Sequence, residues 1–174
     1  MVIWITGLSG AGKTTLAFAL QARLREVRVV RSIVLDGDQI RSVVGDDLGY
    51  SRRERERAIG RIQRLAKMLS EQGVVVIVAA LYHSNAIARW NHAHLRDYFD
   101  VHLNATIDWL RQYRNAKKLY SGVARRYGRP VVGVDIPWDP PATPSLRVDV
   151  SDPYKSVVEV ADLVLSRLPK HADT

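Results

Sequence analysis

The chain of 174 residues has no cysteine, which excludes disulfide bonds and thiolate metal ligands. It also lacks long apolar runs. The hydrophobic stretch ahead of Thr6 and Gly7 is far shorter than a signal-peptide core or a membrane span, and no basic leader precedes it. We therefore expect a cytoplasmic protein without a membrane partner. Apolar residues make up 47% of the chain and charged residues 25%, a mix typical of one compact domain.

Acidic residues are fewer than basic ones: the chain has 18 aspartates and glutamates against 26 lysines and arginines, so the formal net charge is +8. Twenty of the basic residues are arginines, which bind phosphate groups through two-point contacts. A polyanionic partner would explain this surplus, but solvated arginine-rich helix faces explain it equally well. Because no nucleic-acid recognition module or aromatic stacking signature is visible, we expect no nucleic-acid partner.

Short β-branched apolar runs alternate with segments of helical periodicity. Strands are predicted at residues 2–6, 27–35, 74–81, 99–103 and 146–150. Helices are predicted at 13–24, 39–44, 51–72, 84–98 and 153–168, the last with Pro153 at its first position. This order predicts an α/β fold, a single three-layer domain over residues 1–174 with an open parallel five-stranded sheet. Residues 114–145, rich in Lys, Arg, Gly and Pro, interrupt the pattern, and we expect a mobile lid there.

The segment GLSGAGKT at residues 7–14 matches GxxxxGK[ST] in full and lies between a predicted strand and a predicted helix, the context of a P-loop NTPase. Glycines let backbone N–H groups turn toward a phosphate chain, and the helix N-terminus favours negative charge. Lys13 is expected to reach the β and γ phosphates of ATP, and the Thr14 hydroxyl to bind Mg²⁺. The predicted phosphate-binding residues are Gly7, Leu8, Ser9, Gly10, Ala11, Gly12, Lys13, Thr14 and Thr15.

Two other classes of P-loop protein fit less well. A GTPase carries an N/TKxD base-reading motif, and the nearest string, residues 115–118, lacks both its spacing and its Asp. Motor and transporter ATPases place an acid after an apolar strand, but the run at 74–81 is followed by Tyr82, His83 and Ser84. These absences leave a nucleotide-kinase-like protein as the best fit.

An acid pair follows a different apolar run. Asp36 and Asp38 flank a glycine at the end of the strand predicted at 27–35, the sheet edge where ligands bind in open α/β folds. One carboxylate would orient or deprotonate an attacking hydroxyl, and the other would hold magnesium. Asp36 is our first choice for the hydroxyl and Asp38 the alternate, with Asp38 assigned to the metal. Arg41, one helical turn later, is expected to bind a phosphate or sulfate of the acceptor.

These motifs resemble those of adenylylsulfate kinases, which move the γ-phosphate of ATP to the 3′-hydroxyl of adenosine 5′-phosphosulfate. GLSGAGKTT at 7–15, LDGDQIR at 35–41 and DLGYS at 47–51 correspond to three blocks of that family, in order. Residues 114–120 resemble its RDPKGLY lid segment, and residues 133–141 its GIDxPYEPP segment. The resemblance implies ATP and Mg²⁺ as cofactors, a small-molecule nucleotide acceptor and a homodimer.

The resemblance also implies residue roles. Arg114 and Lys117 would contact the donor phosphates beside the loop. The acceptor contacts would be Asp36, Asp38, Arg41, Tyr50, Arg55, Leu81, Tyr82, Lys117, Val131 and Val132.

Departures from the family pattern gather on the acceptor side. Ala58 stands where the family has Asn, Asn85 where it has Arg, and Val131 where it has a Phe that stacks on the acceptor base. With RWN at 89–91, the chain is similar to compact adenylylsulfate-kinase-like proteins of bacterial surface-polysaccharide clusters. A pyrimidine acceptor such as cytidine diphosphoramidate is therefore an alternative. A non-catalytic nucleotide- or nucleic-acid-binding module and a kinase with a sugar or acid acceptor are the others.

Overall fold

A computed structural model of the chain describes residues 1–28, 30–44, 47–81, 84–114, 120, 130–151 and 156–169. Its centre is a five-stranded parallel sheet in the order β2-β3-β1-β4-β5. The strands are β1 (Val2–Gly7), β2 (Ser32–Asp36), β3 (Val75–Ala80), β4 (Tyr98–Asn104) and β5 (Leu146–Asp149). The predicted α/β fold with an open parallel sheet is confirmed.

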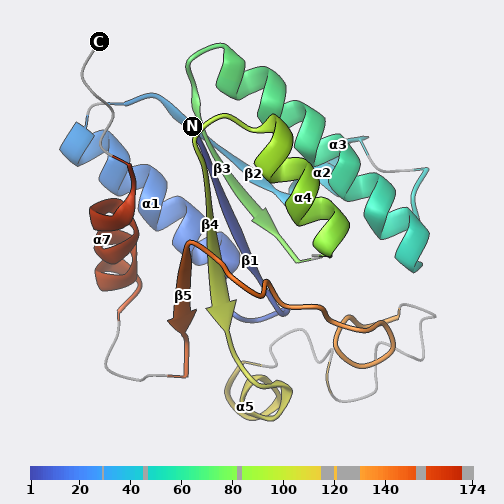
Figure 1. Ribbon diagram of the computed structural model, residues 1–174. Helices are drawn as coiled ribbons and strands as arrows, with labels where there is room; N and C mark the ends of the chain where they lie inside the picture. Colours follow the sequence, from blue (N-terminus) through green and yellow to red (C-terminus); the bar gives the residue numbers. More distant parts are fainter. Residues whose placement is uncertain are drawn as a thin grey trace.

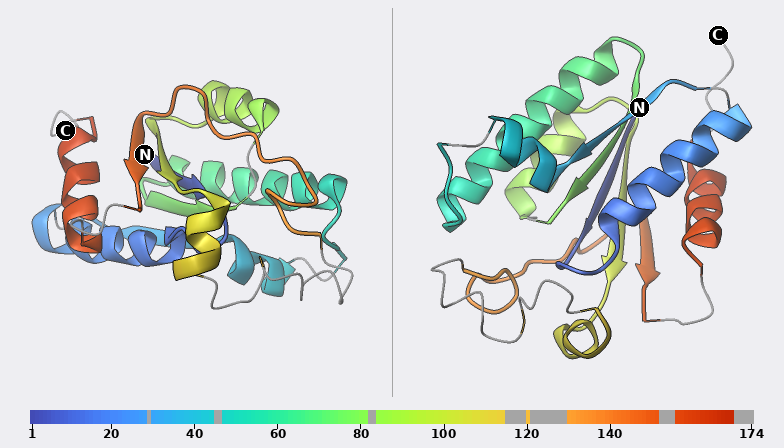
Figure 2. Two further views of the ribbon diagram at one scale, coloured as in Figure 1. Left: turned by 90° about the horizontal axis from the view of Figure 1, so that it is seen from below. Right: turned by 180° about the vertical axis from the view of Figure 1, so that it is seen from behind.

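Helices cover both faces of this sheet (Figures 1 and 2). One face carries α1 (Lys13–Arg28) and α7 (Val157–Arg167), and the other carries α3 (Arg52–Glu71) and α4 (Asn85–His94). The shorter α2 (Gly37–Val44) follows β2, and α5 (Ile107–Tyr113) lies beyond the carboxyl end of β4. No described helix is long and apolar enough to cross a membrane.

The central strands are buried on both sides, which explains their unbroken apolar runs. Because side chains alternate along a strand, Ile3 and Ile5 pack against α1 and α7, whereas Val2 and Trp4 pack toward α3. All four residues have no exposed surface. Because β1 carries apolar side chains on both faces of the sheet, helices must cover both faces, which gives the three layers.

Several predicted boundaries are wrong. The helix α1 continues to Arg28, so the strand expected from residue 27 begins only at Ser32. Val27 is 59% exposed on the last helical turn, where its β propensity is not reinforced by burial. The helix expected over 84–98 ends at His94, because the next residue is extended and Asp97 turns with a left-handed φ of 49°.

The start of the last helix is also corrected. Ser156 caps α7, which therefore begins at Val157 rather than at the predicted residue 153. Its side chain accepts from the backbone N–H of Glu159, whose carboxylate accepts in return from the Ser156 N–H. This reciprocal pair satisfies two donors that the helix itself leaves unpaired, which fixes the helix start. Pro153 lies outside the described residues.

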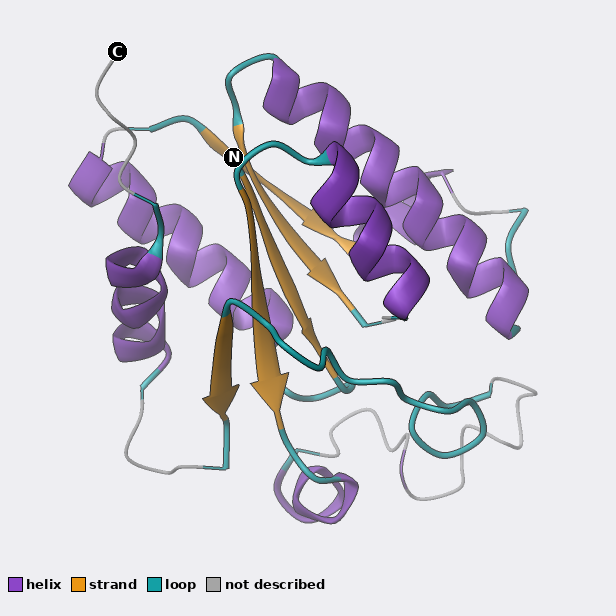
Figure 3. Cartoon of the chain, in the orientation of Figure 1, coloured by secondary structure: helices purple, strands orange, loops and turns teal. Residues whose placement is uncertain are grey.

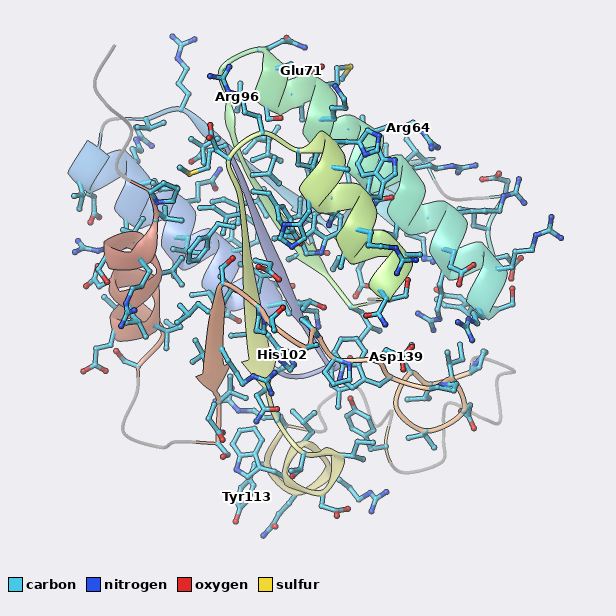
Figure 4. The ribbon with its side chains drawn as sticks, viewed as in Figure 1. Arg64, Glu71, Arg96, His102, Tyr113 and Asp139 are labelled. Carbon is cyan, nitrogen blue, oxygen red and sulfur yellow. The ribbon has the colours of Figure 1, made fainter. Side chains whose placement is uncertain are left out.

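The chain that returns from the predicted lid crosses the sheet face beside α4 (Figure 3). Two hydrogen bonds hold it against β4: the buried Asp100 accepts from the N–H and the hydroxyl of Ser145 at 2.9 and 2.6 Å. Earlier in the same segment, the Trp138 ring lies 6.2 Å from the ring of His102, which Figure 4 labels on β4. These contacts anchor the returning segment. Most of the lid, residues 115–119 and 121–129, lies outside the described part of the chain.

Candidate active site

The predicted phosphate loop connects β1 to α1 at the carboxyl edge of the sheet. Gly10 and Gly12 have φ values of +85° and +94°, which side chains other than glycine rarely adopt. A Cβ atom on Gly10 would also lie 3.0 Å from the carbonyl oxygen of Arg114. The motif glycines are thus required by the loop's shape, independently of any ligand.

Lys13 and Thr14, the first two residues of α1, each donate a hydrogen bond to a group of the site. The Lys13 ammonium donates to the carbonyl of Leu8 at 2.9 Å, across the loop. The Thr14 hydroxyl donates to Oδ2 of Asp36 at 2.6 Å. The structure therefore brings the phosphate loop and the first acid together, although 22 positions separate Thr14 from Asp36.

The two acids differ in their surroundings. Asp36 is only 6% exposed, and its Oδ1 accepts from the backbone N–H groups of Asp38 and Gln39 at 2.9 and 3.1 Å. It thereby caps the start of α2 while its other oxygen accepts from Thr14. Asp38 is exposed in the first turn of α2 and lines the site cavity. The geometry thus gives Asp36 a position beside the phosphate loop and Asp38 one that faces the ligand space.

A cavity of about 630 Å³ opens between the phosphate loop, α2 and α3. Its volume lies within the range of small-molecule sites. Polar residues of the phosphate loop and α2 line it together with apolar residues from α3 and β3. Of the predicted site residues, the lining includes Ser9, Gly10, Gly12, Lys13, Thr14, Thr15, Asp36, Asp38, Arg41, Tyr50, Arg55, Leu81 and Arg114.

Two arginines and a tyrosine form one wall of this cavity. The guanidinium carbons of Arg41 and Arg55 lie 4.9 and 5.4 Å from the centre of the Tyr50 ring. Arg41 donates to the carbonyl of Gly49 at 2.7 Å, and Arg55 donates to those of Tyr50 and Pro130 at 3.0 and 2.9 Å. The wall is therefore held in place from α2, α3 and the returning lid segment.

Glu54 stabilises the loop that carries Tyr50 in this wall. Its carboxylate accepts from the N–H groups of Gly49 and Ser51 at 2.9 and 3.0 Å. A hydrogen bond from the Ser51 hydroxyl, together with those two N–H groups, lowers the pKa of Glu54. The S-x-x-E pattern at 51–54 predicts the helix start, but its second task, fixing the loop that carries Tyr50, has no signal in the sequence.

Tyr120 connects the lid to the phosphate loop. Its hydroxyl donates to the carbonyl of Ser9 at 2.8 Å, and its own carbonyl accepts from Arg111 at 3.2 Å. Val131 and Val132, predicted acceptor contacts, are buried in the core cluster with Tyr120 and are absent from the cavity lining. Tyr82 and Lys117 fall outside the described residues.

Burial raises the pKa of Tyr120 to about 12, so its hydroxyl remains a donor well above neutral pH. Because the folded form then holds its proton more tightly than the unfolded chain, Tyr120 favours folding below pH 10, and this contribution is lost as the pH rises from about 10 to 12. We expect the free energy of unfolding to fall more steeply over that interval in the wild type than in Tyr120→Phe. Urea titrations at pH 9 and 11 measure the difference, and parallel slopes for the two proteins would contradict it.

A second, smaller cavity of about 120 Å³ lies on the other side of the phosphate loop. Gly10, Gly12, Thr15 and Arg114 line both cavities, so the two meet at the loop. Aliphatic side chains from α1, β4, β5 and α7 form most of its interior, and Asp149 of β5 and Trp109 of α5 form part of its wall. The sequence predicts five of the lining residues as ATP contacts, namely Gly10, Ala11, Gly12, Thr15 and Arg114. The other lining residues come from five separate elements without a shared motif, so no sequence pattern predicts them.

The parallel sheet, the strand–loop–helix phosphate cradle and the acid pair at its edge define a P-loop kinase. The chain belongs to the adenylylsulphate kinase family, whose model matches residues 1–149. It is 33% identical to the adenylyl-sulfate kinase of Synechococcus sp. (strain JA-3-3Ab) over 98% of this chain and 95% of that protein. A probable adenylyl-sulfate kinase from Synechocystis sp. is 35% identical over 92% of this chain and 90% of its own length.

The solved structures agree. The structure of the Mycobacterium tuberculosis APS kinase CysC in complex with AMPPNP and APS matches with a TM-score of 0.85 and 30% identity, over 96% of each chain. A sugar kinase from Janibacter sp. shares the fold, with a TM-score of 0.64 and 15% identity over 97% of this chain and 95% of its own. Family membership confirms the predicted class, a phosphotransferase with an alcohol group as acceptor.

Proposed function

We propose that this protein is an ATP-dependent kinase that transfers the γ-phosphate of ATP to the 3′-hydroxyl of adenosine 5′-phosphosulfate. The observation that carries the proposal is the convergence of Lys13, the Thr14–Asp36 pair and Asp38 on one cavity. Its relatives named adenylyl-sulfate kinase and the complex with AMPPNP and APS in a similar structure support the choice of both substrates.

The phosphate loop would hold the triphosphate through its backbone N–H groups. Lys13 would exchange its bond to the Leu8 carbonyl for one to the β and γ phosphates. Arg114, which lines both cavities, would add positive charge near the transferred group. We assign Lys117 the same task from the resemblance alone.

The residues near Thr14 fit a magnesium ion. Its hydroxyl and the Asp36 carboxylate supply hard oxygen atoms next to the loop. Among the residues that the structure describes, no group of three or more His, Cys, Asp or Glu side chains could enclose a metal. This suits Mg²⁺, which usually takes one or two protein oxygens and completes its shell with water and phosphate. Bound there, the ion would neutralise charge on the phosphates.

We assign Asp38 to the acceptor hydroxyl and Asp36 to the metal side, the reverse of the first choice made from the sequence. Asp36 already accepts from Thr14 and from two backbone N–H groups, whereas Asp38 faces the cavity. Asp38 would orient the 3′-hydroxyl and accept its proton as the phosphoryl group arrives. Arg41 and Arg55 would bind the anionic end of the acceptor.

Replacement of Arg55 by Ala is expected to raise the KM for the acceptor at least about 10-fold, because a hydrogen-bonded charge is lost from the cavity wall. The KM for ATP should change little, since Arg55 lines only the acceptor side. Arg57→Ala, on the exposed side of the same helix, is the matched control. Equal increases in both KM values for Arg55→Ala would contradict an acceptor role.

A pyrimidine acceptor is the second candidate, favoured by the apolar part of the cavity lining. Ala58, Ile59, Ile62 and Leu81 line it, so few of the described side chains there could read the edge of a particular base. Initial rates with adenosine 5′-phosphosulfate, cytidine diphosphate and cytidine diphosphoramidate, each with ATP and Mg²⁺, decide between the two. A clear preference for adenosine 5′-phosphosulfate supports the first proposal, and a preference for the cytidine nucleotides replaces it by the second. The homodimer and the cytoplasmic location stay predictions.

A further inference from the structure

Among the residues that the structure describes, Trp109 is the one aromatic residue that lines the smaller cavity. It belongs to the short helix α5, where the Thr106 side chain caps the helix by accepting from the Trp109 N–H at 3.2 Å. Tyr113 from the same helix, labelled in Figure 4, has its ring centre 5.6 Å from that of Trp109. The cap fixes the backbone that carries the indole, and the ring of Tyr113, which is 61% exposed and lines the larger cavity, lies beside it.

Arg114 lies against the same indole. Its guanidinium carbon is 5.8 Å from the Trp109 ring centre, within the range of a cation–π contact. The carbonyl of the same residue faces Gly10, where an added Cβ would lie 3.0 Å away. Arg114 thus lies between Trp109 and the phosphate loop and contacts both.

Most of the remaining lining is aliphatic, and Thr15 and Asp149 add polar groups to it. Leu16, Leu103, Val148, Val150 and Val160 line the cavity, and Leu103 and Val148 are 3% exposed. A small, mainly aliphatic space bounded by an indole, a guanidinium and the side chain of Asp149 matches a flat heteroaromatic ring with polar edges better than a sugar or a phosphate. Gly10, Gly12 and Thr15 of the phosphate loop line both cavities. A base in the smaller cavity can therefore belong to the same nucleotide as a phosphate chain bound on the loop.

We propose that Trp109 is a donor-binding residue whose indole stacks with the base of the phosphoryl donor and so contributes to the selection of ATP. This inference rests on the proposed function, since it presumes that the triphosphate lies on the loop. Stacking on an aromatic side chain contributes about 1–3 kcal/mol per base, which corresponds to roughly 5- to 150-fold in affinity. The effect depends on the base and leaves the phosphate contacts unchanged.

The test compares ATP with inorganic tripolyphosphate, which carries the same phosphate chain without a base. Calorimetry with Mg²⁺ is expected to show ATP binding weakened at least about 5-fold in Trp109→Ala, unchanged tripolyphosphate binding, and ATP affinity largely restored in Trp109→Phe. The intrinsic fluorescence change on ATP binding should disappear in Trp109→Phe. It should persist in Trp90→Phe, since Trp90 lies on α4 stacked against His94.

The outcomes separate this inference from the proposed function. Equal weakening of ATP and tripolyphosphate in Trp109→Ala would mean a merely structural role for the indole and would overturn the inference. Unchanged ATP affinity in the same variant would overturn it as well, and in both cases the proposed kinase activity stands. If the wild-type protein binds neither ligand, the proposed function falls together with the inference.

Discussion

Lys13→Ala is expected to abolish nearly all phosphoryl transfer, by at least about 100-fold, while the protein remains folded. Lys13 is half-buried and lines the cavity. It directly follows Gly12, so its ammonium is the cation nearest in sequence to the glycines of the phosphate loop. In the transition state it would stabilise charge that develops on the β and γ phosphates, and no neutral side chain can replace that interaction. Rates with saturating ATP and acceptor, together with the thermal midpoint, measure the two effects separately.

The matched control is Lys67→Ala. Lys67 lies on the exposed surface of α3 and pairs with Glu71 one turn later, far from both cavities. Removal of one such surface pair changes stability little and should leave the rate at the wild-type level. A Lys13→Ala protein that turned over at the rate of the Lys67→Ala protein would disprove the role given to the phosphate loop.

Asp38→Asn is expected to lower the rate by about 100- to 10,000-fold, the usual contribution of a general base. The change keeps the size of the side chain and removes its ability to accept a proton. Asp38 is exposed, so the thermal midpoint should remain close to that of the wild type. The affinity for ATP with magnesium should also persist, because Thr14 and Asp36 remain in place.

Asp36→Asn provides the comparison. This carboxylate caps α2 and accepts from Thr14, so its replacement should lower the thermal midpoint and weaken magnesium-dependent ATP binding. Calorimetry with and without Mg²⁺ measures the second effect. If Asp36→Asn lost turnover with intact stability and metal-dependent binding, while Asp38→Asn stayed active, the assignment of the two acids would have to be exchanged.

Much of the fold can be predicted from the sequence because its signals are local. The apolar runs of β1 and β3 are buried on both faces, and the glycines at 10 and 12 occupy backbone positions that need glycine. The cap formed by Ser51 and Glu54 marks the start of α3 within four residues. Such features depend on neighbours in the chain, so no knowledge of the tertiary structure is required.

The parts that escape prediction depend on contacts between distant segments. The Tyr120 hydroxyl reaches the Ser9 carbonyl across 111 positions, and Arg55 reaches Pro130 across 75. The smaller cavity collects side chains from five helices and strands, and only the fold reveals that Trp109 is among them. The different surroundings of Asp36 and Asp38, on which their proposed roles rest, likewise depend on the bond from Thr14, which a strand-end motif alone does not predict.

The most direct test of the central claim follows the γ-phosphate itself. ATP labelled at that position is incubated with Mg²⁺ and adenosine 5′-phosphosulfate, and the position of the label in the product is determined. The proposed chemistry predicts one labelled phosphate on the 3′-hydroxyl of the acceptor for each ADP released. ADP formation with the label only in inorganic phosphate, or no consumption of ATP at all, would contradict it.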